Sequence, residues 1–231
     1  MKESVIGMAK VNWKNSKTAW LITAVIFLSA GVAYYIMAIF IDYFLGDVIA
    51  LGNFLYAAPL FLAIFVPAQN FSKLMHLGGN RKNFFRSALI TYVPVAAGAS
   101  LVSILTHMIL DALLTSAGMI GSSLDLLNGF GFMEHGSVVA FFQMTVFLLF
   151  VSCAAHTLTL IQGHWYGWVC DGLIIAVICV FTPIEPLRGA LVWFWNMAIF
   201  HEYAIVQIVF CLVLALAIYA ASLVPIKSKR I

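Results

Sequence analysis

Charged side chains are scarce in this chain of 231 residues. Aspartate, glutamate, lysine and arginine together make up 9% of the sequence, whereas hydrophobic residues make up 64%. Because soluble domains carry about 25% charged residues, this composition excludes an ordinary water-soluble fold. We therefore predict an integral membrane protein with little soluble mass, in which the location of the charges says more than their net sum of +3.

Cysteine is also rare, and its placement argues against a disulfide or metal framework. The chain has four cysteines, which all fall within apolar runs and form no C-x-x-C pair. Such cysteines are typical of buried packing residues. They are Cys153, Cys170, Cys179 and Cys211.

Motifs of catalysis and nucleotide binding are missing as well. The sequence has no G-x-x-x-x-G-K-[ST] phosphate loop, and the segment 78–82 has a similar composition without that spacing. It has no H-E-x-x-H or G-x-S-x-G motif, and its six histidines are scattered. We therefore predict no catalytic residues, no metal ligands and no cofactor bound by this chain itself.

Long hydrophobic runs are what the sequence has instead. A helix needs about 20 apolar residues to cross the hydrocarbon core of a bilayer. By that measure we predict an all-α membrane protein, a single transmembrane domain with six membrane-spanning helices. The expected spans are residues 18–41, 48–68, 87–110, 138–161, 166–182 and 203–224. The second span contains Pro59, and we expect it to stop sharply at Pro67.

Two apolar segments do not fit a span. Residues 1–17 place Lys10, Lys14 and Lys17 on one helical face, which predicts an amphipathic helix lying in the cytoplasmic interface. The alternative is a basic tail that only sets the topology. Residues 183–202 are too interrupted to span but rich in tryptophan and phenylalanine, whose rings settle at headgroup depth. We expect a re-entrant or interfacial helix pair there, on the extracellular side.

Six spans place both termini on one side of the membrane, and the charges agree on which side. If the termini are cytoplasmic, every lysine and arginine except Arg188 falls inside. The acids that fall outside are Asp42, Asp47, Asp125, Glu134 and Glu185. This distribution follows the positive-inside rule. We therefore predict a multi-pass protein of the plasma membrane with both termini in the cytoplasm.

The longest basic interruption is residues 69–86, between the second and third expected spans. Phe71 and Leu74 recur at helical spacing, which predicts a short amphipathic helix. Gly78 stands where a helix-ending residue takes a positive φ. Asn80 is then a suitable N-cap for a second helix that runs into the third span.

Arg81 and Lys82 stand in the first turn of that second helix. The helix dipole disfavours each cation there by about 0.3–1 kcal/mol, so another group must offset this cost. Lipid phosphate at the cytoplasmic surface would do so, and an acidic protein partner would do so too. The residues alone leave both explanations open.

The same residues carry a resemblance to a known family. The pattern L-x-x-x-G-x-N-R-K-x-F-F resembles the L-G-x-[ST]-R-K-x-F-F segment of bacterial ABC-2-type permeases, the membrane subunits of ABC exporters. It comprises Leu74, Gly78, Asn80, Arg81, Lys82, Phe84 and Phe85. Asn80 replaces the usual serine or threonine and keeps the capping role. The order of segments, from the N-terminal interfacial helix to the re-entrant helices before the last span, is similar too.

This resemblance implies a function and partners. Residues 69–86 would form the coupling helix that docks on a separate ATPase subunit, and that subunit would bind the ATP and Mg²⁺. A second permease copy or a paralogue would complete the translocation path among membrane lipids, and no nucleic acid is expected. The chain looks like permeases of antimicrobial-peptide resistance systems and phenol-soluble modulin exporters, so the expected cargo is an amphipathic peptide. The expected ATPase-coupling residues are Phe71, Lys73, Leu74, His76, Gly78, Asn80, Arg81, Lys82 and Phe84.

A few polar residues fall inside the expected spans, where they are costly and therefore candidates for function. They are Asp171, His107 and Asp111. The alternative is structural: His107 and Asp111 are spaced to pair on one helix, and Asp171 could pair with a neighbouring helix or with His164. An intramembrane enzyme stays open as a second class, and it requires Asp171, His156 and His107 to meet in one cavity. A third class is a non-catalytic toxin-immunity or sensor protein, which works without an ATPase.

Overall fold

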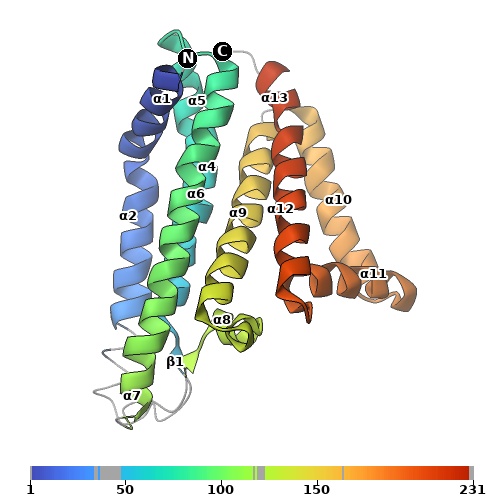
Figure 1. The fold of residues 1–231 in the computed structure, drawn as a ribbon. Coiled ribbons are helices and arrows are strands. Elements are labelled where there is room, and N and C mark those ends of the chain that lie inside the picture. The colour runs from blue at the N-terminus through green and yellow to red at the C-terminus, as the bar shows by residue number, and fades with distance from the viewer. Residues whose placement is uncertain are drawn as a thin grey trace.

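A bundle of helices forms almost the whole protein (Figure 1). The computed structural model describes residues 2–33, 36, 48–116, 118, 123–162 and 164–228. Within these residues the strands are one short parallel pair, β1 (Val48–Ile49) and β2 (Ser123–Leu124). The predicted all-α class is therefore confirmed.

The first two helices are nearly continuous. α1 (Lys2–Asn15) leads into α2 (Lys17–Ile26) because the amide of Ser16 donates to the carbonyl of Asn12 at 3.1 Å. The π-helix η1 (Phe27–Val32) continues α2. Together α2 and η1 measure about 24 Å at a rise of about 1.5 Å per residue, less than the about 30 Å of a bilayer core. Most of residues 34–47, which include the end of the first expected span, Asp42 and Asp47, lie outside the described residues.

Four helices of the described residues are long and apolar enough to cross a membrane. The first runs from Leu51 to His76 and consists of the 3-10 helix η3 (Leu51–Tyr56), α4 (Ala57–Phe65), the π-helix η4 (Val66–Asn70) and α5 (Phe71–His76). The second is α6 (Arg81–Leu105) with the π-helix η5 (Thr106–Asp111). The third is α9 (Ser137–Ile161), and the fourth is α12 (Ala204–Ala221), which leads into α13 (Leu223–Ser228).

The predicted stop at Pro67 is wrong. The helix passes Pro67 within the π-turn η4 and runs on into α5. A proline nitrogen has no proton to donate, and a π-turn accommodates this by shifting the local hydrogen-bond register. α5 is therefore a direct extension of a long apolar helix, and the basic turn that follows α5 is carried on its end.

A bent pair of helices separates α9 from α12 in the chain. α10 (Trp165–Phe181) meets α11 (Glu185–Trp195) and the π-helix η7 (Asn196–Phe200) at an angle of 115° (Figure 1). α10 has 17 residues, or about 25 Å, and reaches the length of a span only together with α11. The described residues thus contain four candidate spans, or five with the bent pair. The count of six spans stays a prediction.

The core lies around α9, which packs against α4, α6 and α12. Its buried residues include Ala140, Met144, Cys153 and Leu160. Buried aromatic rings from the other helices close this core near the α5–α6 turn. They belong to Phe71, Phe84, Tyr92 and Tyr219.

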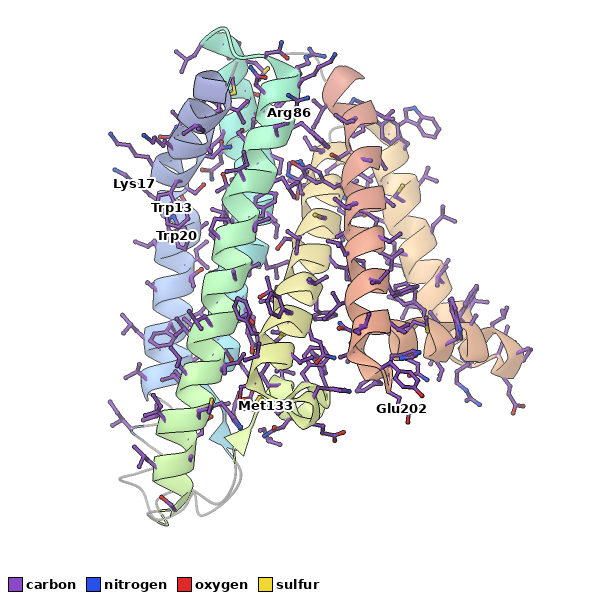
Figure 2. All side chains as sticks on the ribbon, in the orientation of Figure 1. Trp13, Lys17, Trp20, Arg86, Met133 and Glu202 are labelled. Carbon is purple, nitrogen blue, oxygen red and sulfur yellow. The ribbon has the colours of Figure 1, made fainter. Side chains whose placement is uncertain are left out.

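Residues of opposite charge lie toward the two ends of the bundle, with Arg86 near one end and Glu202 at the other in Figure 2. The α5–α6 turn, α1 and α13 lie together at the end nearer Arg86 (Figure 1). The opposite end carries α7 (Ala112–Ser116), α8 (Leu126–Gly129) and the 3-10 helix η6 (Phe132–His135), and Glu202 lies there in Figure 2. A separation of cations from acids along the bundle is what the positive-inside rule expects of a membrane protein.

Candidate functional site

The turn between α5 and α6, residues 77–80, is closed by caps on both sides. The amide of Gly79 donates to the carbonyl of Leu74 at 2.9 Å, and Gly78 has a φ of +78°. This is a Schellman ending of α5. At the start of α6 the side chain of Asn80 accepts a hydrogen bond from the amide of Lys82 at 2.9 Å. The predicted helix–glycine–helix segment is therefore confirmed.

The apolar side chains of this segment belong to the core. Phe71, Leu74 and Phe84 are buried, and the rings of Phe71 and Phe84 meet edge-on with centroids 5.1 Å apart. Phe85 stacks on Tyr219 of α12 at 4.3 Å. We expected Phe71, Leu74 and Phe84 among the coupling residues, but their burial keeps them away from any docked subunit. They fix α5 against α6 instead.

The outward side of the turn is basic. Lys73, His76 and Lys82 are exposed, whereas Arg81 is half-buried. Leu77, at the tip of the turn, is 81% exposed. A single exposed apolar side chain is normal on a protein surface, but Leu77 is the exposed apolar residue at the tip of this basic turn. Leu77 was not among the residues that the sequence singled out.

α1 is fastened to this turn. Asn12 is buried, donates to Ser87 Oγ of α6 at 3.2 Å, and accepts from Asn70 Nδ2 at 3.4 Å. A Cβ added to Gly79 would lie 2.8 Å from the Met8 side chain, so α1 packs directly on the turn. The lysines at positions 10, 14 and 17 remain exposed. α1, α5 and α6 thus form one connected basic end, and the interfacial position of α1 in a membrane stays a prediction.

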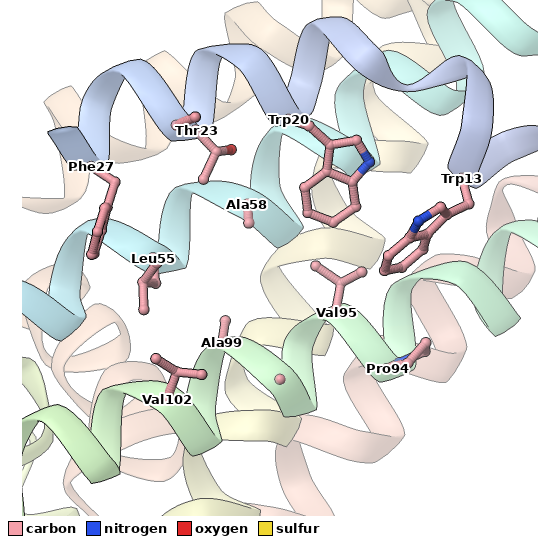
Figure 3. A pocket seen from close by; sticks show the side chains of 12 residues that line it. Trp13, Trp20, Thr23, Phe27, Leu55, Ala58, Pro94, Val95, Ala99 and Val102 are labelled. Carbon is pink, nitrogen blue, oxygen red and sulfur yellow. The ribbon is translucent and has the colours of Figure 1, made fainter.

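An apolar groove of about 430 Å³ lies between α1, α2, α4 and α6. The rings of Trp13 and Trp20, with centroids 4.8 Å apart, flank it in Figure 3, and Val95 and Ala99 of α6 form its opposite wall. The hydroxyl of Thr23 donates to the carbonyl of Ala19 in its own helix at 2.9 Å. The buried Nε1 of Trp20 has no hydrogen-bond acceptor among the described residues, so the groove is mostly apolar and keeps one unpaired donor at its edge. Its twelve lining residues are Trp13, Trp20, Thr23, Ala24, Phe27, Leu55, Ala58, Pro94, Val95, Gly98, Ala99 and Val102.

The polar residues of the spans have separate partners. His156 is fully buried, and its Nδ1 lies 2.7 Å from the hydroxyl of Tyr92. Asp171 is half-buried and accepts a hydrogen bond from Gln162 Nε2 at 2.7 Å. His107 lies in η5 and pairs with acids of the opposite end. The partners of His107, His156 and Asp171 thus differ, and whether each residue is structural or functional stays a prediction.

His107 has two acidic neighbours. Its Nδ1 lies 3.9 Å from Asp111 Oδ2, the pair that the sequence suggested, and 2.9 Å from Asp125 Oδ2. Asp125 Oδ1 caps α8 by accepting from the amide of Leu127 at 3.0 Å. Burial raises the pKa of the Asp125 carboxyl, although that hydrogen bond and the nearby imidazole act in the opposite direction. Sequence reasoning missed Asp125 as a neighbour of His107, because no helical spacing relates the two positions.

α10 is covered by very little of this chain. Gly167 is its one buried residue. Trp168 is 73% exposed, and Leu173 and Ile175 are 59% and 61% exposed. A helix that is apolar on all sides requires lipid or other helices around it. Asp171, on this same helix, lies at the border of that uncovered surface.

Comparison with protein-family models, curated proteins and solved structures found no match for this chain.

Proposed function

We propose that this chain is the membrane permease subunit of an ATP-driven exporter of the ABC-2 type. The observation that carries the proposal is the α5–α6 turn, an exposed basic tip with Leu77 at its end, mounted on two long apolar helices. Caps at Gly78 and Asn80, together with the buried contact between Phe71 and Phe84, brace this tip. A force applied to the tip would therefore reach α4 and α6 without being absorbed by a loose loop.

The partner at this tip would be a separate ATPase subunit with an acidic docking surface. Lys73, His76 and Lys82 would meet its acids at the edge of the contact, and Leu77 would enter an apolar pocket. The ATPase would hold ATP and Mg²⁺, since this chain has no phosphate-binding loop. The basic end, and with it both termini, would then face the cytoplasm.

A second permease copy or a paralogue would cover α10. The exposure of Trp168, Leu173 and Ile175 supports this arrangement, because another chain would cover these apolar side chains. Burying Asp171 between two chains would also remove a half-exposed carboxylate from lipid, where charged groups are costly.

The cargo would be an amphipathic peptide. The groove beside Trp13 and Trp20 supports this class, because it is apolar and open and lies next to the basic end. An apolar side of a helical peptide would fit such a surface, and its polar side would remain outward. The intramembrane enzyme receives no support from the described residues, where His107, His156 and Asp171 have separate partners.

Reconstitution tests this function. The chain alone in proteoliposomes should hydrolyse no ATP, whereas the chain with its ATPase subunit should hydrolyse ATP faster when an amphipathic peptide is added. A labelled peptide should then accumulate in the vesicle lumen of inside-out complexes only with ATP. If a purified permease–ATPase pair cannot be formed, or if peptide flux is the same without ATP, the proposal is wrong.

A further inference from the structure

The acidic end of the bundle contains a buried group of one histidine and two aspartates. Nδ1 of His107 and carboxylate oxygens of Asp111 and Asp125 all lie within 4.8 Å of one another. The side chains of Asp111 and Asp125 are 3% and 1% exposed, and that of His107 is 21% exposed. The group joins the end of the long α6–η5 helix to the turn that precedes α8.

The ion pairs of this group join one imidazole to two carboxylates. The sequence contains no lysine or arginine between Arg86 and Arg188, nor between Lys17 and Lys73. One imidazole thus faces two buried carboxylates. Buried charges are costly unless they are paired or bind a metal.

Asp125 Oδ2 points to the same conclusion. The Oδ1 atom of Asp125 accepts the amide of Leu127, whereas its buried Oδ2 accepts no hydrogen bond within the described residues and has an ion-pair contact with His107 Nδ1 at 2.9 Å. The contact lacks the alignment of a hydrogen bond, so a fully buried carboxylate oxygen is aimed into the group without a donor. Such an oxygen is placed for an additional cation.

The segment that carries Asp125 is held in place independently of His107. Asn53 Nδ2 donates to the carbonyl of Leu124 at 2.9 Å, and its Oδ1 accepts from the amide of Leu126 at 3.2 Å. One side chain of η3 therefore clamps both peptide groups that flank Asp125. The backbone of Asp125 is therefore held in a fixed position, and a binding site requires ligands that are fixed in this way.

We propose that His107, Asp111 and Asp125 bind one divalent transition-metal ion, with Zn²⁺ as the representative ion. One imidazole nitrogen and two carboxylate oxygens are donors that Zn²⁺ accepts, at bond lengths of about 2.0–2.2 Å. Ca²⁺ and Mg²⁺ prefer oxygen donors alone. The three donor atoms lie within 4.8 Å of one another, so they would move closer together around such an ion, and a water molecule would take the remaining position. The bound ion would tie the end of α6 to the 123–129 segment and so brace the acidic end of the bundle.

Metal analysis of the full chain tests this inference. The purified protein, stripped with a chelator and dialysed against Zn²⁺, should retain one zinc per chain, and excess Mg²⁺ should not displace it. Zinc-edge X-ray absorption should show nitrogen and oxygen ligands and no sulfur. Sulfur ligation would place the ion on cysteines instead, and retention of no zinc would overturn the proposal outright.

Variants locate the site. Asp125→Asn and His107→Ala should each lower zinc affinity at least about tenfold, whereas Asp171→Asn makes the same chemical change elsewhere and should leave affinity unaltered. Asn53→Ala, which removes the clamp and no ligand, should weaken binding about 10- to 100-fold, the usual effect of groups that orient ligands. Unchanged zinc affinity in Asp125→Asn would refute the site. Because the wild-type measurements stand alone, a variant that does not fold leaves the proposal testable.

Discussion

Reversing two charges on the α5–α6 turn should weaken ATPase docking selectively. Lys73 and Lys82 are exposed, lie on either side of Leu77, and make no salt bridge within the described residues. An exposed ion pair contributes about 0.2–1 kcal/mol. Replacing two attractions with two repulsions in the double variant Lys73→Glu/Lys82→Glu should therefore cost about 1–4 kcal/mol of binding free energy. This is a loss of affinity of about fivefold to several-hundredfold.

The assay is binding of purified ATPase subunit to the permease in nanodiscs, at low and at high salt. The control is Lys10→Glu/Lys14→Glu, which makes the same charge change on exposed lysines of α1 at the same end of the bundle. The turn variant should lose affinity, and added salt should no longer weaken its binding and should partly restore it, because salt screens the new repulsions between exposed charges. The variant should still insert into membranes. Equal losses in both variants would mean that overall charge matters and the turn does not. No loss in either would favour lipid phosphate as the partner of these cations.

Three further outcomes follow from the geometry. Asn80→Ala removes the cap of α6 and should lower stability by about 1 kcal/mol, measured as a lower melting temperature and faster amide exchange at the turn, whereas Asn80→Ser should restore both. Gly98→Trp should fill the groove and reduce binding of an amphipathic peptide several-fold. Gly98→Ala should leave peptide binding unchanged, since a Cβ at this position meets no atom within 4 Å. Equal peptide binding by the two variants would show that the groove does not bind the peptide. Tyr92→Phe removes the hydroxyl that contacts the buried His156 Nδ1 and should lower the free energy of unfolding by about 1 kcal/mol. The complex should still hydrolyse ATP. A complete loss of hydrolysis would show that this pair has a role beyond packing.

The local design of the basic turn could be read from the sequence because its signals are local. Gly78 and Asn80 act through the backbone of their nearest neighbours, and the spacing of Phe71 and Leu74 reports which helical face is buried. The same spacing does not say that Phe84 comes to lie against Phe71. For that reason the expected coupling residues include three that are buried in the core, Phe71, Leu74 and Phe84, and leave out the exposed Leu77.

Features that depend on tertiary packing could not be predicted from the sequence as well as the turn. Pro67 reads as a helix end, but a π-turn carries the helix past it, and the choice depends on neighbouring helices. His107 was paired with Asp111 by helical spacing, whereas the closer Asp125 comes from a different segment held by Asn53. The break expected after residue 182 lies where α10 and α11 meet, but hydropathy gives neither the angle of 115° nor whether the two helices form one broken span.

The most direct test of the coupling surface is photochemical crosslinking from the tip of the turn. A photoreactive phenylalanine analogue replaces Leu77, which is 81% exposed, or Val138, which is 72% exposed in the first turn of α9, directly after η6. In native membranes the probe at position 77 should form an adduct with the ATPase subunit, and the probe at position 138 should form none. Lipid adducts alone at position 77 would contradict the claim that this turn docks a partner protein.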